Sequence, residues 1–171
     1  MKILRAFWLA VAAILALGGL AQAAPDLPPL TGRQILAITG LDPARFPGGE
    51  VDFDLGRLKA LGAEHLHTST IWTNGVLDFT GVPLVTLTHF LGLTSGKLHA
   101  VALNDYTVDI PVSDAVKDGP LLAYALGGKP MPVRDKGPLW IVYPYDQNPA
   151  YRNEVIYTRS IWQLEHIEVE H

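Results

Sequence analysis

Short apolar segments, separated by polar and turn-forming residues, run through most of the chain. Alternation of apolar and polar positions is typical of strands that are buried on one face. On this basis strands are predicted at residues 34–38, 65–72, 76–79, 98–103, 106–110, 121–126, 139–143 and 163–170. Asn74 and Gly75, a dipeptide that favours a tight turn, join the second of these strands to the third. The fourth and fifth form another hairpin-like pair.

Three helical segments are predicted between these strands. Residues 54–61 begin with Asp54, a residue type that caps helix N-termini, and residues 83–91 begin with a proline and end before Gly92. Residues 113–117 are expected to form a short helical turn. Many short strands with a few short helices predict an α+β fold.

The first 23 residues have the layout of a secretory signal peptide. A basic start precedes the almost wholly apolar residues 6–20, and residues 21–23 place alanine at the two positions that a signal peptidase reads. The alternative is a membrane anchor, but the apolar run is shorter than the roughly 20 residues that a bilayer requires. We therefore expect residues 1–23 to be removed and residues 24–171 to form one periplasmic domain, without membrane insertion after cleavage.

Composition and charge narrow the classes of partner. The chain has no cysteine, so the stability of an exported domain must come from its core and not from disulfides. Lys and Arg total 13 against 17 Asp and Glu, and loss of the basic leader makes the balance more acidic. An acidic domain without a basic run disfavours nucleic acid as a partner.

Four segments, in order along the chain, carry a family resemblance. They are GVPL with Leu87 at residues 81–87, NDY followed by DIPV at 104–112, LLAYALGGKPMPVRDKGPLWIVYP at 121–144, and a closing pattern of SI, L and IEV at 160–169. Together they resemble the sulfite-oxidase-type molybdopterin-binding superfamily, and its small exported members look closest. The resemblance implies that superfamily's α+β fold, with mixed short strands and a few short helices.

The resemblance also implies a cysteine thiolate that ligates molybdenum, and this chain has none. The thiolate position falls near residues 65–72, where the hydroxyls of residues 68–70 are poor substitutes for a soft thiolate. Trp162 and Trp140 stand where the family has lysine and arginine, which removes positive charge that would hold a pterin phosphate. The leader lacks the twin-arginine pair of proteins exported with their cofactor. We therefore expect no bound cofactor, and molybdopterin is implied by the resemblance alone.

A polar set is predicted to line a remnant pocket, because the resemblance puts its segments near the mouth of the pterin cleft. Its members are Asn104, Asp105, Tyr106, Arg134, Asp135, Lys136, Arg159 and Trp162. In this hypothesis the three cations are charge partners for an anionic or polar small molecule. The alternative makes residues 134–136 a solvated turn and residues 104–105 a hairpin tip whose side chains bond their own backbone.

Three tyrosines suggest a second kind of surface. Tyr145, Tyr151 and Tyr157 alternate with polar residues in the segment 144–160, and this mixture is typical of recognition surfaces. The segment is therefore a candidate partner-binding loop. The alternative is a packed loop that closes the fold.

Metal and catalytic motifs are weak in this sequence. His65 and His67 lie two apart on a predicted strand and so share a face, but two ligands do not make a site, and nothing in the spacing requires His166 to join them. We therefore predict no metal site. The sequence lacks a nucleophile elbow and a phosphate-binding glycine loop. Asp52 and Asp54 are interpreted as capping residues and not as an acid–base pair.

The leading prediction is therefore a periplasmic binding or accessory module without catalytic residues. It would bind a small molecule or dock on the periplasmic face of a membrane protein such as a sensor kinase or cyclase. The competing prediction is a molybdopterin-dependent oxidoreductase in which water, an oxo group or a hydroxyl replaces the thiolate. A fold alone does not assign an oxidoreductase activity.

Overall fold

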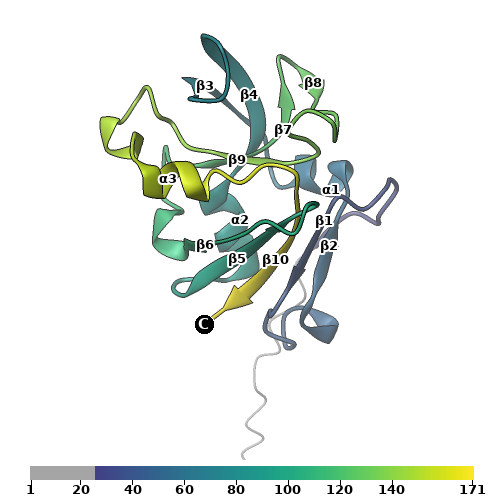
Figure 1. Cartoon of the computed structure of the whole chain (residues 1–171). Coiled ribbons are helices and arrows are strands. Elements are labelled where there is room, and N and C mark those ends of the chain that lie inside the picture. The colour runs from purple at the N-terminus through teal and green to yellow at the C-terminus, as the bar shows by residue number, and fades with distance from the viewer. Residues whose placement is uncertain (1–25) are drawn as a thin grey trace, which may run out of the picture.

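The computed structural model describes residues 26–171, which form two five-stranded sheets and three short α-helices (Figure 1). The fold class is α+β, as the pattern of short strands predicts. The expected signal peptide, residues 1–23, lies outside the described residues. Within residues 26–171 no helix combines the length and the apolar character needed to cross a bilayer.

The first sheet joins the two ends of the domain. Its strands are β1 (Leu36–Thr39), β2 (Val51–Phe53), β5 (Lys97–Ala102), β6 (Thr107–Pro111) and β10 (Leu164–Glu170). They are arranged in the order β2-β1-β10-β5-β6, with β10 parallel to β1 and antiparallel to β5. The last strand of the domain therefore occupies the centre of a sheet whose other members come from earlier in the chain.

The second sheet is antiparallel throughout. Its strands are β3 (Glu64–Ser69), β4 (Val76–Pro83), β7 (Leu121–Leu126), β8 (Lys129–Pro130) and β9 (Trp140–Val142). The pairing of β4 with β7 shifts register between Thr80 and Gly81. A side chain at Gly81 would overlap the Leu122 carbonyl oxygen, so the irregular pairing depends on glycine at this position.

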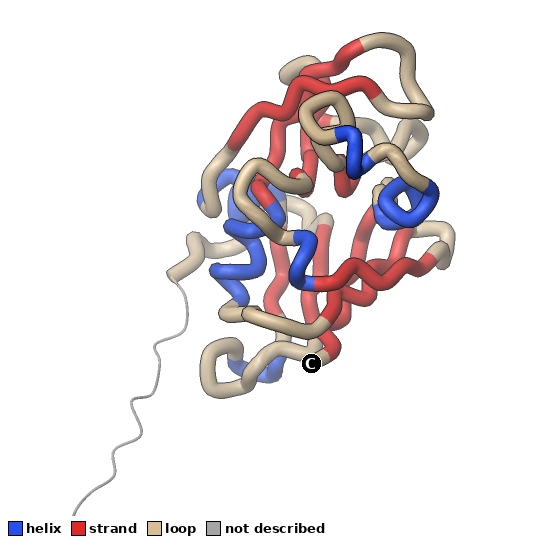
Figure 2. Tube along the Cα trace, turned by 90° about the vertical axis from the view of Figure 1, so that its left-hand side faces the viewer, coloured by secondary structure: helices blue, strands red, loops and turns tan. Residues whose placement is uncertain are grey.

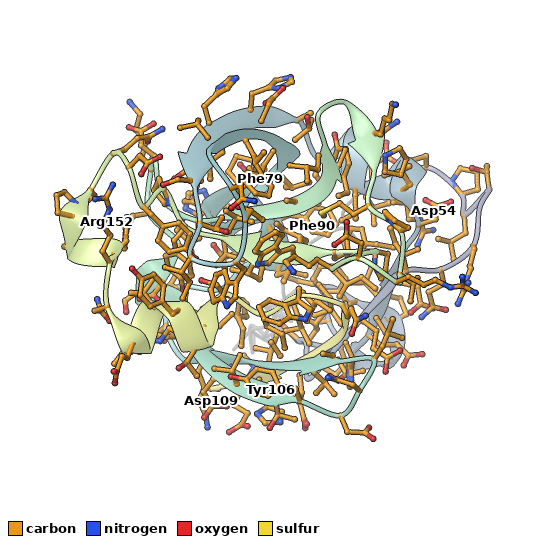
Figure 3. All side chains as sticks on the ribbon, turned by 45° about the horizontal axis from the view of Figure 1, so that its top comes forward. Asp54, Phe79, Phe90, Tyr106, Asp109 and Arg152 are labelled. Atoms are coloured by element: carbon orange, nitrogen blue, oxygen red, sulfur yellow. The ribbon has the colours of Figure 1, made fainter. Side chains whose placement is uncertain are left out.

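The helices α1 (Leu55–Ala60), α2 (Leu84–Leu91) and α3 (Glu154–Arg159) have recognisable ends. Asp54 caps α1 through a hydrogen bond from the Arg57 amide, and α2 ends at Gly92, whose φ of 78° is left-handed. Figure 2 shows the strands in two groups, with the helices and loops around them. Aromatic and aliphatic side chains from both sheets fill one core, in which Phe79 and Trp140 are fully buried. Phe79 and Phe90 lie toward the middle of the molecule in Figure 3.

The observed elements agree with most of the predicted ones, but several differ. Strand β8, which has two residues, is not predicted. Strand β2 is not predicted, because three residues are too few for an alternating pattern to be detected. Helix α3 lies in the segment predicted as a loop. The helical turn expected at residues 113–117 is a 3-10 helix, Val112–Asp114, slightly earlier in the chain. Of the two aspartates interpreted as caps, Asp54 is one, whereas Asp52 lies on β2 and accepts a hydrogen bond from Gln34 at 2.7 Å.

Candidate functional site

A groove of about 600 Å³ opens where three segments meet. These segments are the loop after β3, the turn between β5 and β6, and α3 with the residues that lead to β10. The lining residues are Ile71, Trp72, Asn104, Tyr106, Glu154, Tyr157, Thr158, Ser160, Ile161 and Trp162. A concave, largely apolar surface of this volume is typical of a small-molecule site.

Aromatic rings build the walls of the groove. Trp72 contacts Trp162 edge-on, with ring centroids 5.3 Å apart, and Tyr157 at 5.9 Å. The fully buried Trp140 lies 6.0 Å from Trp72 and 5.3 Å from Phe79, which connects the walls to the core. Edge-to-face contacts of this kind hold each ring in one orientation. The apolar surface of the groove is therefore preformed.

A cation already packs against part of this cluster. The Lys136 ammonium lies 5.0 Å from the ring centroid of Trp162 and 5.6 Å from that of Trp140. Lys136 lines a smaller hollow that it shares with Trp140 and Asp135, and not the groove itself. Attraction between an ammonium and an indole face is worth about 0.5–1 kcal/mol at exposed sites. Lys136 thus stabilises the position of Trp162, a groove residue, without lining the groove itself.

Hydrogen bonds of the buried Tyr143 and Tyr145 hold α3 in place, and α3 forms the third wall of the groove. Ser160, at the end of the helix, donates to the Ile156 carbonyl at 2.7 Å and shares a short hydrogen bond with the Tyr145 hydroxyl. The Tyr143 hydroxyl donates to Asp114 at 2.7 Å, and Arg159 contacts the same carboxylate at 3.0 Å. These contacts tie α3 to β9 and to the 3-10 helix before β7.

Burial keeps both tyrosines protonated. It raises the pKa of Tyr145 to about 12 and, together with the neighbouring Asp114 carboxylate, raises the pKa of Tyr143 well above its usual range. A protonated hydroxyl can donate the hydrogen bond that Asp114 accepts. Both groups therefore support the wall structurally over the whole physiological pH range.

The charge of the groove does not favour an anion. Within residues 26–171 no Lys, Arg or His side chain lines it, and its charged lining residue is the exposed Glu154. Its polar lining residues include Asn104 and Thr158. Such a surface suits an uncharged or positively charged ligand with an apolar body.

The predicted pocket residues separate into two places. Asn104, Tyr106 and Trp162 line the groove together with Tyr157, which sequence reasoning placed in the partner surface. Asp105 is exposed at the hairpin tip with a φ of 63°. The Asn104 side chain accepts a hydrogen bond from the Tyr106 amide, as the hairpin-tip alternative expected.

The three predicted charge partners do not converge on the groove. Arg134 and Asp135 are exposed in the turn before β9, Lys136 packs on tryptophan, and Arg159 pairs with Asp114. The side chains of the set therefore do not form a cationic pocket around the groove. The solvated-turn alternative describes Arg134 and Asp135 better, but not Lys136.

The three tyrosines of the predicted partner surface face inward to different degrees. Tyr145 is 2% exposed and therefore offers a partner no surface. Tyr151 and Tyr157 are half-buried, and Tyr151 packs against Tyr143 with ring centroids 5.4 Å apart. The segment resembles the packed-loop alternative, and its large exposed apolar side chain is Val155.

Sequence reasoning missed Ile71 and Trp72, although both line the groove. The prediction ended a core strand at Trp72, whereas β3 ends at Ser69 and the next three residues form the loop. Ile71 is 60% exposed, which is unusual for an isoleucine in a turn. The available signal was an apolar pair one residue before the Asn74-Gly75 turn.

In the segment expected to hold a metal thiolate, the hydroxyls of residues 68–70 are already hydrogen-bonded. Ser69 donates to Asp146 at 2.7 Å, and Thr70 shares a hydrogen bond with Thr73 at 2.7 Å. Thr68 is fully buried, donates to the Ser69 carbonyl and accepts from the Asp146 amide at 3.2 Å. Together with the absence of cysteine and of a lining cation, these bonds mean that the residues present do not fit a thiolate-ligated molybdopterin.

One cluster of histidine and carboxylates lies away from the groove, on the first sheet. His99 and Lys97 contact Asp109 at 2.7 and 2.6 Å, and Lys97 also reaches Glu170 at 3.1 Å. The hydrogen bonds from Lys97 and His99 lower the pKa of Asp109. The ammonium occupies the position between the two carboxylates that a metal ion would need. Asp109 lies near the outer edge of the molecule in Figure 3.

Comparisons with known proteins add no family to this description. A scan against protein-family models and a search of the curated proteins found no match for the chain.

Proposed function

We propose that this chain is an exported binding module that holds a small organic molecule in the groove at Trp72 and Trp162, without molybdenum and without catalysing a reaction. The observation that carries the proposal is the preformed aromatic groove. Its walls are fixed through Trp140 to the core, so little ordering of side chains opposes binding. Neither an activated nucleophile nor a soft metal ligand lies among its lining residues.

The ligand is an uncharged or cationic molecule with an apolar or aromatic body. Stacking on indole and phenol rings favours such a body, and Glu154 at the rim favours positive charge. An anion would meet this carboxylate without a compensating lining cation. This differs from the anionic ligand that the sequence suggested, because Arg134 and Arg159 lie outside the groove.

The family resemblance suggests how the groove evolved. We propose that the domain has the sulfite-oxidase-type fold and that aromatic residues have replaced its cofactor-binding groups. The segment near the expected thiolate supplies Ile71 and Trp72 to the groove. Trp162, which stands where the family has a lysine, lies beside Trp72 in the lining of the groove. In this proposal, changes in these two segments removed cofactor binding and created the apolar groove.

A matched pair of probes tests the proposal. Benzyltrimethylammonium and benzenesulfonate have similar bodies and opposite charges, and binding of each can be followed by tryptophan fluorescence and thermal shift. We expect saturable binding of the ammonium probe, little binding of the sulfonate, and loss of ammonium binding in Trp72→Leu and Trp162→Leu. Arg134→Ala, an exposed change outside the groove, is the control.

The outcomes separate the hypotheses. Stronger binding of the sulfonate, lost in Arg134→Ala, would restore the anionic pocket and overturn the proposed ligand class. Binding of either probe that survives both tryptophan replacements would place the site elsewhere. Stoichiometric molybdenum and pterin in protein purified from its natural host would favour the oxidoreductase over the binding module.

A further inference from the structure

Strand β3 presents two histidines on one outward face of the second sheet. His65 and His67 are two residues apart and exposed, while the intervening Leu66 is buried. In the register with β4, His67 lies opposite Asp78. The backbone pairing of two strands therefore brings an imidazole pair and a carboxylate to the same patch of surface.

The three side chains already converge on one atom. The Nδ1 atom of His65 lies 3.0 Å from Oδ1 of Asp78, and the Nε2 atom of His67 lies 3.6 Å from the same oxygen. The two imidazole rings are stacked, with centroids 6.5 Å apart and planes at 21°. Within residues 26–171 the Asp78 carboxylate forms no ion pair with Lys or Arg.

We infer that His65, His67 and Asp78 form a surface site for a divalent transition-metal ion. Two imidazoles and one carboxylate are a ligand set that suits Zn²⁺, Cu²⁺ and Ni²⁺ better than Mg²⁺ or Ca²⁺, which prefer oxygen ligands alone. Three protein ligands leave at least one coordination position for water or for a group from a partner. These residues do not line the groove, so the inference is independent of the proposed function.

Binding requires only a small rearrangement of exposed side chains. A zinc–nitrogen bond is about 2.0–2.1 Å long. The two stacked rings must therefore turn so that one nitrogen of each reaches the same ion. The side chains of His65 and His67 are 60% and 66% exposed, so their rings can turn without losing core packing. The cost of ordering them makes the site weaker than a closed structural zinc site.

The cluster of His99, Asp109 and Glu170 provides a comparison within the same chain. Its ligand atoms all lie within 4.8 Å of one another, a closer grouping than His65, His67 and Asp78 form. Lys97 bridges its two carboxylates, however, and a metal would have to displace that ammonium. It also holds one imidazole instead of two. The His65 site has the better ligand set, and His99 is a natural control position.

Calorimetric titration with ZnCl₂ and with MgCl₂ tests the inference on the chain without a polyhistidine tag. We expect one Zn²⁺ per chain, no Mg²⁺ binding, and at least about 10-fold weaker Zn²⁺ affinity in His65→Ala, His67→Ala and Asp78→Asn. The control His99→Ala should bind as the parent does. Because both histidines are exposed and Asp78 is partly exposed, circular dichroism is expected to show unchanged folding of each variant.

A second measurement identifies the ligands directly. Electron paramagnetic resonance of the Cu²⁺ complex should show two coordinating nitrogens in the parent and one in either histidine variant. Absence of Zn²⁺ and Cu²⁺ binding would overturn the inference. So would binding that survives His65→Ala and His67→Ala, or that disappears in His99→Ala.

Discussion

Tyr106 donates a hydrogen bond from its hydroxyl to the Thr158 carbonyl oxygen at 3.2 Å, across 52 residues of sequence. Tyr106 belongs to the turn between β5 and β6, and Thr158 belongs to α3. The bond therefore connects two walls of the groove that the backbone does not join directly.

Removing this hydroxyl should loosen the groove. In Tyr106→Phe the phenyl ring remains, but the link to α3 is lost, so we expect benzyltrimethylammonium to bind several-fold more weakly. The free energy of unfolding should fall by about 0.5–1 kcal/mol, because the residue is partly exposed. Fluorescence titration and urea unfolding measure the two effects. Tyr151→Phe, which removes a tyrosine hydroxyl outside the groove, should leave probe affinity unchanged. Equal effects of both changes would contradict the role of this link.

Replacement of Gly81 should destabilise the second sheet. An added Cβ atom would lie 2.6 Å from the Ala123 Cα atom, so β4 and β7 would have to separate where their register shifts. Overpacking of this kind costs about 1–3 kcal/mol, and we expect Gly81→Ala at the upper end. Urea unfolding checks the value. The control is Gly32→Ala, whose new Cβ would make only ordinary contacts beginning at 3.5 Å. Similar midpoints for the two variants would contradict the close approach of the strands.

Asp54 should make the free energy of unfolding depend on pH in the acidic range. Hydrogen bonds from the backbone amides of Arg57, Gly32 and Thr31 lower its pKa to about 2. The folded state thus binds this proton less readily than the unfolded state does. The stabilisation is present above about pH 4 and is lost as the pH falls toward 2.

Substitution of Asp54 tests this dependence. We expect Asp54→Asn to have a lower free energy of unfolding than the parent at pH 7. This gap in free energy should become smaller as the pH falls from 4 to 2. Urea unfolding at a series of pH values follows the difference. Asp26→Asn, at an exposed position, should keep the parent's profile. A constant difference between Asp54→Asn and the parent would show that the charge is not what stabilises the cap.

Loss of Asp114 should leave a buried hydroxyl without its partner. Tyr143 is fully buried and donates to Asp114 at 2.7 Å, so Asp114→Ala should lower the free energy of unfolding by about 1–3 kcal/mol. Adding Tyr143→Phe should restore part of that loss, because the unpaired hydroxyl is then gone. A double-mutant cycle in urea measures the coupling. Strictly additive effects would mean that the two side chains do not stabilise each other.

Local sequence signals predicted the regular elements well but the site less completely. The Asn-Gly turn after β3 and the proline and glycine that bound α2 act within a few residues, so their effect can be inferred from the sequence. The α+β class followed from such elements. Asn104, Tyr106 and Trp162 were found through a resemblance to whole segments and do line one groove.

The rest of the site depends on contacts between distant residues. Arg159 was expected to bind an anion, but Asp114, 45 residues away, already neutralises it. Tyr145 was placed on a surface because its neighbours are polar, yet Ser160 and the core enclose it. The charge of a partner and the depth of a side chain are set by tertiary packing, which no short pattern encodes.

The central position of β10 has a consequence for biosynthesis. A nascent chain that stops before residue 164 has no strand to place between β1 and β5, so the two halves of the first sheet stay apart. The first sheet therefore cannot be completed until residues 164–170 have been synthesised. Until those residues are present, β1 and β5 lack the strand that holds them in one sheet.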